Sequence, residues 1–233
     1  MQYTKLSVIV PAYNEEDTIA EILTRISQVD LPLEIETIVV DDCSTDHTRQ
    51  ILEGMTGVRC VYNDRNLGKG GAVRKGFEAA SGEIVIIQDA DLEYYPSDYA
   101  RMIDPILRGE TEVVLGVRLY PVNDIRKRKP IYWLSWLGNK TITLLTNVLY
   151  GNNAMEYEGC YKAFTKHLVD AVDLRSNGFE LDNELVCKIM RRGYGTVDVP
   201  IRYSPRDYSH GKKIRWYDGF RILWIIVMCR FGD

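Results

Sequence analysis

The feature that organises this chain is the stretch from Gly82 to Glu93, which reads GEIVIIQDADLE. Four aliphatic residues in a row, after a Ser81-Gly82 turn signal, predict a strand that is buried on both faces. Alternate side chains of a strand share a face, so we expect Asp89, Asp91 and Glu93 to converge on one point. A divalent cation would relieve their mutual repulsion, and Mg²⁺ or Mn²⁺ that also binds substrate phosphates is the expected ligand. The alternative is an ordinary strand-to-loop transition with solvated acids.

The composition is that of one globular domain. At 233 residues, with 45% apolar and 27% charged residues, the chain can form one sizeable core. The formal net charge of -4 argues against a general nucleic-acid binder, which is usually basic. Five scattered cysteines without a CxxC pair favour a reduced, cytoplasmic setting. We expect neither a signal peptide nor a membrane-spanning segment, because no apolar run approaches ~20 residues.

Strands and helices alternate over roughly the first 120 residues. Four further apolar runs predict strands, at 6–10, 35–40, 58–62 and 113–115. Apolar residues at helical spacing predict helices between them, at 19–29, 45–54 and 73–80. This alternation predicts an α/β fold, with a mostly parallel central sheet that is flanked by helices on both faces.

The predicted strand ends carry the polar residues. Ligands of such sheets bind at the carboxyl ends of the strands. Residues 11–15, Asp41-Asp42 and residues 89–93 all fall at such ends. A ligand is therefore expected at this edge of the sheet.

The second half of the chain has a different pattern. Residues 131–150 are apolar and aromatic and predict one or two helices. A further helix begins near Phe179 and ends at Gly193, a strand covers 196–203, and a last helix begins near Trp216. No linker or repeat separates the halves, so the chain is predicted to be a single domain.

Lys69-Gly70-Gly71 is a candidate phosphate contact. The spacing Gly68-x-Gly70-Gly71 matches neither a P-loop nor a dinucleotide fingerprint, and no GxGxxG follows the first strand. A nicotinamide cofactor is therefore not expected. Contact of Lys69 with a phosphate and a purely structural role for the glycines both stay open.

Asp41-Asp42 is a candidate contact for a ribose or a base edge, because carboxylates accept hydrogen bonds from hydroxyl and N–H donors. The alternative is an acid cluster that stabilises the start of the next helix. His47, His167 and His210 stand apart from any nucleophile pattern and are interpreted as surface residues.

Four motifs carry a family resemblance: VIVPAYNE at 8–15, VVDDCSTD at 39–46, NLGKG at 66–70 and DAD at 89–91. In this order and spacing they resemble family 2 glycosyltransferases with the Rossmann-like GT-A fold. Four stretches resemble the branch of dolichol- and polyprenyl-phosphate mannosyl- or glucosyltransferases: 66–72, 91–96, 116–118 and 199–201. The resemblance covers nearly the whole chain. It implies a nucleotide-sugar-binding half at 1–120 and an acceptor-binding half at 121–233.

On the donor side, the resemblance implies that Pro11, Tyr13, Glu15 and Asp42 cradle the nucleotide. Lys69 is placed with them in the nucleotide-sugar site.

Asp89 would contact the ribose or the metal, and Asp91 would bind the metal that bridges the diphosphate. Glu93 stands where many relatives have Gln and is expected to be a third metal ligand.

On the acceptor side, four arginines match positions that resemble acceptor-phosphate contacts: Arg118, Arg126, Arg128 and Arg206. Arg118 is also expected to act with Asp89 and Asp91 in catalysis.

The implied function is metal-dependent, inverting transfer of a hexose from a GDP-mannose or UDP-glucose type donor to a polyprenyl or dolichyl phosphate. An ionised phosphate acceptor needs cations rather than a general base, whereas an alcohol needs a carboxylate base. Glu180, Asp182 and Glu184 lie where relatives that act on hydroxyls carry such acids. A soluble family 2 transferase with a hydroxyl acceptor is therefore the alternative. A non-catalytic nucleotide-sugar-binding module is a distant one, against which the intact Asp89 and Asp91 argue.

Two apolar segments are candidate membrane-surface elements. They are the stretch around Trp133 and Trp136 and the helix from Trp216 to Cys229, with basic residues beside them. A membrane surface or a membrane-protein partner, on the cytoplasmic face, is the expectation. Packing of both segments into the core is the alternative.

Overall fold

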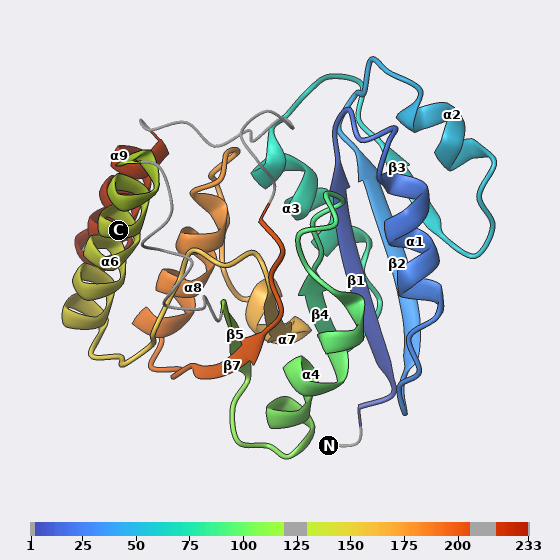
Figure 1. Ribbon diagram of the computed structural model, residues 1–233. Helices are drawn as coiled ribbons and strands as arrows, with labels where there is room; N and C mark the ends of the chain where they lie inside the picture. The colour runs from blue at the N-terminus through green and yellow to red at the C-terminus, as the bar shows by residue number, and fades with distance from the viewer. Residues whose placement is uncertain (1–2, 119–129, 206–217, 233) are drawn as a thin grey trace.

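Seven strands of the computed structural model form one sheet in the order β3-β2-β1-β4-β6-β5-β7 (Figure 1). The structure describes residues 3–118, 130–205 and 218–232. The strands are β1 (Lys5–Ala12), β2 (Glu34–Asp41), β3 (Arg59–Tyr62), β4 (Ile84–Ile87), β5 (Val113–Arg118), β6 (Lys162–Thr165) and β7 (Val197–Ile201). Four pairings are parallel, and only β6 runs antiparallel to its neighbours β4 and β5. The predicted α/β fold with a mostly parallel central sheet is confirmed.

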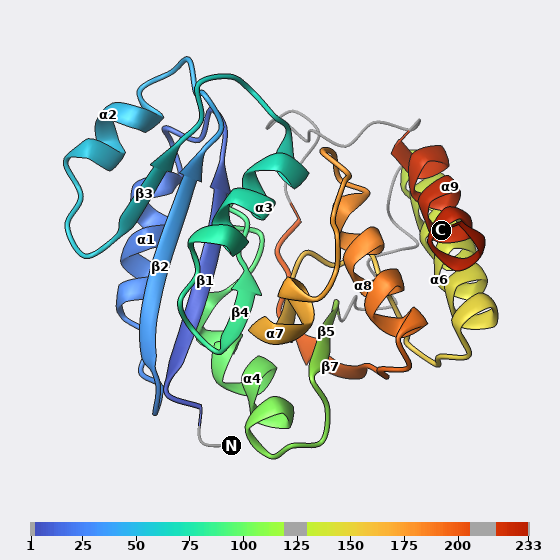
Figure 2. The same ribbon diagram turned by 180° about the vertical axis from the view of Figure 1, so that it is seen from behind.

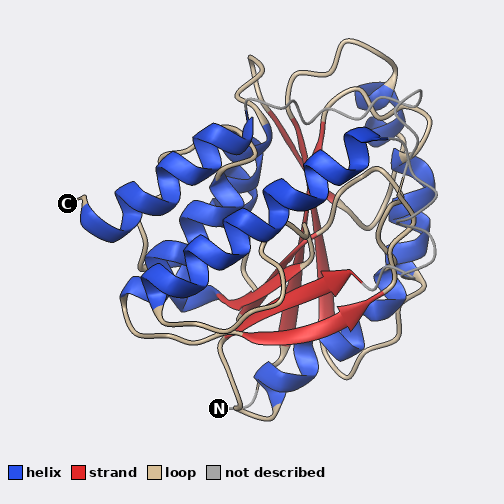
Figure 3. Cartoon of the chain, turned by 60° about the vertical axis from the view of Figure 1, so that its left-hand side comes forward, coloured by secondary structure: helices blue, strands red, loops and turns tan. Residues whose placement is uncertain are grey.

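The helices lie on both faces of the sheet and in an outer layer. They are α1 (Ile19–Ser27), α2 (Thr48–Glu53), α3 (Lys69–Ala79), α4 (Tyr99–Leu107), α6 (Pro130–Tyr150), α7 (Lys166–Asp170), α8 (Leu181–Arg191) and α9 (Asp218–Phe231), with a 3₁₀ turn η1 (Pro96–Asp98) before α4. Figure 1 shows α1 and α4 in front of the sheet, and Figure 2 shows α3, α7 and α8 on the opposite face. The helices α6 and α9 pack against each other and against α8, outside this layer (Figure 3).

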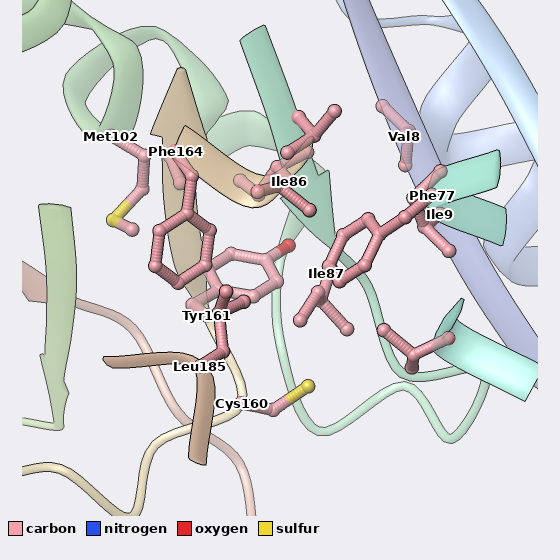
Figure 4. Close-up of a cluster of buried hydrophobic side chains, with 14 of the residues drawn as sticks. Val8, Ile9, Phe77, Ile86, Ile87, Met102, Cys160, Tyr161, Phe164 and Leu185 are labelled. Carbon is pink, nitrogen blue, oxygen red and sulfur yellow. The ribbon is translucent and has the colours of Figure 1, made fainter. Parts of the chain in front are cut away.

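The sheet core is built from strands that are apolar on both faces. All four residues of β4 are fully buried, and Ile9 of β1 is paired with Ile38 of β2 on one side and Ile87 of β4 on the other. Figure 4 shows Phe77 of α3 beside Ile9 and Ile87. The buried-strand interpretation of residues 84–87 is therefore confirmed, because helices cover both faces.

Strand β1 continues past the position where the sequence predicts its end. Pro11 lies inside β1 and is paired with Val40. The carbonyl of Ile9 accepts a hydrogen bond from Gln88 N and therefore points toward the β4 side. Backbone polar groups two residues apart in a strand point to the same side, so the backbone nitrogen of Pro11 also faces β4. Because β4 ends at Ile87, the missing N–H of Pro11 removes little from the ladder.

The elements that the sequence did not indicate are α4, α7 and β6. The buried residues Tyr99, Met102, Ile103 and Ile106 of α4 do have helical spacing, but Pro105 interrupts the pattern. Strand β6 comes from the second half of the chain and lies between β4 and β5 of the first half. The sheet therefore spans the boundary near residue 120, and the division into a donor half and an acceptor half stays a prediction.

Candidate active site

The loops that follow β1 and β2 are hydrogen-bonded to each other. Asn14 N donates to Ser44 Oγ at 3.0 Å, and Thr45 N donates to Asn14 Oδ1 at 2.8 Å. Glu15 N donates to Thr48 Oγ1 at 2.8 Å. Because β2, β1 and β4 are neighbours in the sheet and parallel, their carboxyl ends lie at one edge. The predicted convergence of these strand ends is confirmed.

The structure places the first donor-side candidates at the end of β1. Pro11 and Tyr13 are half-buried, and the Glu15 carboxylate accepts a hydrogen bond from the Thr18 hydroxyl at 2.9 Å. Their contact with a nucleotide stays a prediction.

Asp42 holds the loop that leads into α3. Its Oδ1 accepts hydrogen bonds from Asn63 Nδ2 and Leu67 N, and its Oδ2 accepts one from Gly68 N, each at 2.8 Å. The residue is 2% exposed. The structure therefore gives Asp42 an internal role, and its predicted contact with a ribose or base remains untested.

The glycines at the start of α3 allow close packing against residues 176–178. Gly68 has a φ of +83°, and a Cβ there would lie 2.5 Å from the Asn177 carbonyl oxygen. A Cβ on Gly70 would lie 2.8 Å from three backbone atoms of residues 176–178, and Gly70 N donates to Asn177 O at 2.8 Å. The structural role of this glycine run is therefore clear, and it places Lys69 at the sheet edge.

Lys69 and Asp89 form an ion pair of 2.8 Å, with side chains that are 16% and 21% exposed. Lys69 Nζ also lies 3.4 Å from Cys160 Sγ. Burial alone would lower the pKa of Lys69, but its electrostatic interactions with Asp89, Cys160 and Asp182 and its hydrogen bond to Asp89 together raise that pKa well above its usual value. Burial opposes the ionised form of Asp89, yet Lys69 holds the pKa of Asp89 below its usual value. Burial raises the pKa of the Cys160 thiol well above its usual value.

Asp182 and Lys162, from the second half of the chain, lie close to the Lys69–Asp89 pair. Lys162 was not identified from the sequence. Asp182 Oδ2 lies 3.9 Å from Lys69 Nζ and 4.0 Å from Lys162 Nζ. Lys162 of β6 is 1% exposed and donates a hydrogen bond to the Gly159 carbonyl. A lysine inside the apolar run CYKAF at 160–164 was the signal that could have found this buried cation.

The other two acids near the start of α8 have internal contacts. Glu184 is 1% exposed, accepts a hydrogen bond from Ser176 N at 2.8 Å and pairs with Lys188. Glu180 Oε1 accepts a hydrogen bond from Gly178 N at 3.2 Å. Its Oε2 is buried and has no hydrogen-bond partner among the described residues.

Asp91 and Glu93 do not join Asp89 in the way that strand alternation predicts. Strand β4 ends at Ile87, and Leu92 has a φ of +63°, which turns the chain. Asp91 Oδ1 accepts a hydrogen bond from Glu93 N at 3.1 Å. The Glu93 carboxylate accepts one from the Tyr203 hydroxyl at 2.8 Å.

The expected site of three carboxylates is therefore not formed. The described part of the chain contains no group of three His, Cys, Asp or Glu side chains that could hold a metal. The hard oxygen atoms of Asp89 and Asp91 still suit Mg²⁺ or Mn²⁺, because Mg²⁺ in such sites takes one or two carboxylates and completes its shell with substrate phosphates and water. Metal binding by Asp89, Asp91 and Glu93 stays a prediction.

Gln88 and three tyrosines form a network of hydrogen bonds and stacked rings next to Asp89. Gln88 Oε1 accepts hydrogen bonds from the hydroxyls of Tyr99, at 2.8 Å, and Tyr161. Gln88 Nε2 donates to the Asp89 carbonyl at 2.9 Å. The Tyr94 ring stacks on Tyr161 with centroids 4.8 Å apart. This network fixes the backbone that carries Asp89.

Arg118 is the acceptor-side arginine that the structure describes. Its guanidinium forms two hydrogen bonds to Glu156 Oε1, its backbone N donates to Glu156 Oε2, and it lies 5.0 Å from the Tyr203 ring centroid. Three further expected phosphate contacts lie outside the described residues: Arg126, Arg128 and Arg206. The predicted contact of Arg118 with an acceptor stays a prediction.

The histidine interpretation agrees with the structure where it can be compared. His47 and His167 are exposed, and His210 lies outside the described residues.

Comparison with known proteins places the chain. The model of glycosyl transferase family 2 matches residues 7–172. The UDP-N-acetylglucosamine–dolichyl-phosphate N-acetylglucosaminyltransferase of Methanococcus voltae is 25% identical, over 97% of this chain and 96% of its own length. The undecaprenyl-phosphate 4-deoxy-4-formamido-L-arabinose transferase of Proteus mirabilis is 27% identical over 89% of this chain, which spans 62% of that relative.

A solved structure supports the fold. Glucosyl-3-phosphoglycerate synthase from Mycobacterium tuberculosis, in complex with Mg²⁺ and uridine diphosphate, matches with a TM-score of 0.75 and 20% identity. The match covers 98% of this chain and 79% of that one.

The sheet, its helices and these matches define a glycosyltransferase with the GT-A fold. The chain belongs to glycosyl transferase family 2. Its resemblance to transferases that use polyprenyl phosphates is confirmed by the relatives.

Proposed function

We propose that this enzyme transfers a hexose from a nucleotide diphosphate sugar, of the GDP-mannose or UDP-glucose type, to a polyprenyl or dolichyl phosphate with inversion. Relatives named for lipid-phosphate acceptors support the acceptor class. The observation that carries it is the position of Asp182 within about 4 Å of two ammonium groups, those of Lys69 and Lys162. This carboxylate is already engaged with two lysines, and a phosphate acceptor needs no general base.

In the proposed reaction an oxygen of the acceptor phosphate attacks the anomeric carbon. The bond from that carbon to the donor diphosphate breaks, and the nucleoside diphosphate leaves with the bonding electrons. The ionised phosphate has no proton that must be removed. The ion pair with Lys69 fixes the Asp89 carboxylate at the sheet edge, and Arg118 is the described arginine whose planar fork suits the incoming phosphate.

Asp91, together with Asp89, would hold Mg²⁺ or Mn²⁺ beside the donor diphosphate. When bound, such a metal neutralises the charge that develops on the leaving diphosphate. Both residues lie in the loop that follows the buried strand β4.

One observation favours transfer to a hydroxyl instead. Glu180 has a buried carboxylate oxygen without a hydrogen-bond partner among the described residues, and a general base for an alcohol acceptor requires such a carboxylate. This second candidate function makes a different prediction for the acids of the α8 region.

The test is transfer of labelled sugar from GDP-mannose and from UDP-glucose, with Mg²⁺ or Mn²⁺, to a short, water-soluble polyprenyl phosphate. We expect metal-dependent transfer that a chelator abolishes. Asp91→Asn should lower it by about 100-fold or more. The matched control is Asp170→Asn, at an exposed ion pair on α7, which should leave the rate unchanged.

Variants of the acids separate the two acceptor classes. Asp182→Asn and Glu180→Gln should each lower transfer to the lipid phosphate by less than about 10-fold, whereas loss of a general base costs about 10²- to 10⁴-fold. A preference for a sugar hydroxyl over the polyprenyl phosphate, together with a large loss in Glu180→Gln, would overturn the proposal. Nucleotide binding without turnover of either donor would contradict both candidates.

A further inference from the structure

Helix α6 has an apolar stripe that faces solvent. Leu137, Leu144 and Val148 are 55%, 66% and 71% exposed, and their spacing of seven and four residues places them on one side of the helix. The opposite side, with Ile142 and Thr146, is buried. The helix is therefore apolar on its outer side as well as where it packs.

Helix α9 repeats this pattern. Phe220, Trp224 and Phe231 are 65%, 66% and 72% exposed and recur at helical spacing. Ile222 and Ile226 face inward and are buried. A helix that is apolar all round is typical of a position with protein or lipid on both sides.

The two stripes lie on adjacent helices. The α6 residue Tyr150 donates a hydrogen bond from its hydroxyl to the carbonyl of Ile226 in α9 at 2.8 Å, and the helices run side by side at one end of the molecule (Figures 1 and 3). Nine of the twelve exposed large apolar side chains among the described residues belong to these helices. The α6–α9 face is defined by Trp136, Leu137, Leu144, Val148, Phe220, Trp224, Val227, Met228 and Phe231. The side chain of Trp133 lies outside the described residues.

The charged residues of α6 and α9 are mainly basic. Lys140, Arg221 and Arg230 are exposed, and Asp218 at the first position of α9 is the only Asp or Glu in the two helices. Anionic lipid headgroups complement this combination of aromatic, aliphatic and basic side chains. A second copy of the same face would instead bring like charges together.

A cavity borders the α6–α9 face. A cavity of about 330 Å³ lies between α9 and the segment before α8, and Phe220, Arg221, Trp224 and Glu180 are among the residues that line it. The same segment packs on the glycine run that places Lys69. The segment that lines this cavity therefore also contacts the glycines on either side of Lys69.

We propose that the α6–α9 face docks on the surface of a bilayer that contains anionic lipid. Trp224 and Phe220 enter the boundary between headgroups and acyl chains, and the arginines contact the headgroups. The proposal deepens the proposed function and rests on it in one respect, because a polyprenyl phosphate keeps its chain in the bilayer. None of the helices in the described ranges has the length and apolar character needed to cross a membrane.

The test is flotation of the whole chain with vesicles of phosphatidylcholine and phosphatidylglycerol that contain no polyprenyl phosphate. We expect binding of the native protein, and a loss of at least about 10-fold in Trp224→Glu and in Leu144→Glu. The control is Tyr62→Glu, which is also exposed but lies on β3 at the opposite edge of the sheet and should bind normally. Arg221→Gln and Arg230→Gln should each weaken binding about fivefold, with less effect of added salt.

Three results would overturn the proposal. They are no binding of the native protein, equal binding to pure phosphatidylcholine, and binding that survives Trp224→Glu combined with Leu144→Glu. Sedimentation equilibrium that shows a dimer lost in this double variant, without vesicle binding, would assign the face to a second copy. Thermal unfolding of each variant checks that the fold is intact. Transfer to the water-soluble acceptor by Leu144→Glu separates the two proposals, because it should be normal even if docking fails.

Discussion

Helices α1 and α9 show two ways in which a helix can meet its surroundings. In α1 the buried residues Ile19, Ile22 and Ile26 face the core, and most of the outer residues are polar. In α9 both sides are apolar, and only one side is packed. The polar outer side of α1 is well hydrated, whereas the outer side of α9 exposes apolar surface to water, which is unfavourable. Helix α1 therefore presents a mainly polar surface to solvent, whereas the exposed apolar surface of the α6–α9 region resembles that of an interface.

The polar groups of the two regions differ in the same way. At the sheet edge the buried charges contact partners from separate elements, as Lys69 of α3 does with Asp89 after β4 and with Asp182 of α8. On α6 and α9 the exposed cations outnumber the acids, because Asp218 at the first position of α9 is the only Asp or Glu in the two helices. A change in the first region should alter stability, and a change on the outer side of the second should alter binding.

The largest effect is expected when one member of the buried ion pair is removed. Lys69→Met leaves Asp89 and Asp182 near each other without their shared cation, and should lower the free energy of unfolding by about 4 kcal/mol. Urea unfolding followed by circular dichroism measures it. Lys166→Met, which breaks the more exposed pair with Asp170, is the control and should cost at most about 1 kcal/mol.

A double variant distinguishes lost charge compensation from lost packing. Asp89→Asn added to Lys69→Met should recover part of the stability, since an uncompensated charge is removed. If the double variant is less stable than Lys69→Met by the full cost of a second lesion, the pair does not act through its charges.

The two sides of α9 should respond differently to truncation. Ile226 is fully buried, so Ile226→Ala should cost about 3 kcal/mol through the lost burial and the cavity left behind. Trp224 is 66% exposed, so Trp224→Ala should change stability by no more than about 0.5 kcal/mol while weakening vesicle binding. Equal losses of stability in both variants would show that the outer side of α9 is part of the folded core.

Much of the fold could be predicted from the sequence where one periodicity dominates. The apolar run at 84–87 indicated β4, because helices of this chain cover both faces of the sheet. The helical spacing of apolar residues from Ile19 onward indicated α1. Strand β6 was not indicated. It is short, it runs antiparallel to β4 and β5, and it reaches its place only through long-range pairing.

The candidate site was predictable as an edge of the sheet, but only partly as a set of contacts. Strand alternation indicated that Glu93 would join Asp89, and it failed because the strand ends at Ile87 and Leu92 turns the chain. The contact of Lys162 with Asp182 joins β6 to α8, and local sequence patterns do not predict a contact between such distant segments.

The smallest effect compares a glycine of each region. Gly70 packs against the backbone of residues 176–178, so the Cβ of Gly70→Ala forces that segment to move and should cost about 2 kcal/mol. Gly138 lies inside α6 with no atom within 4 Å of an added Cβ, so Gly138→Ala should raise stability by about 1 kcal/mol through helix propensity. Urea unfolding measures both variants, and vesicle flotation should be unchanged in Gly138→Ala because a methyl group adds little to the apolar face. The two variants change stability in opposite directions only if close packing requires Gly70 and does not require Gly138. A destabilising Gly138→Ala would mean that α6 is packed on its outer side too, and the contrast between the two regions would be lost.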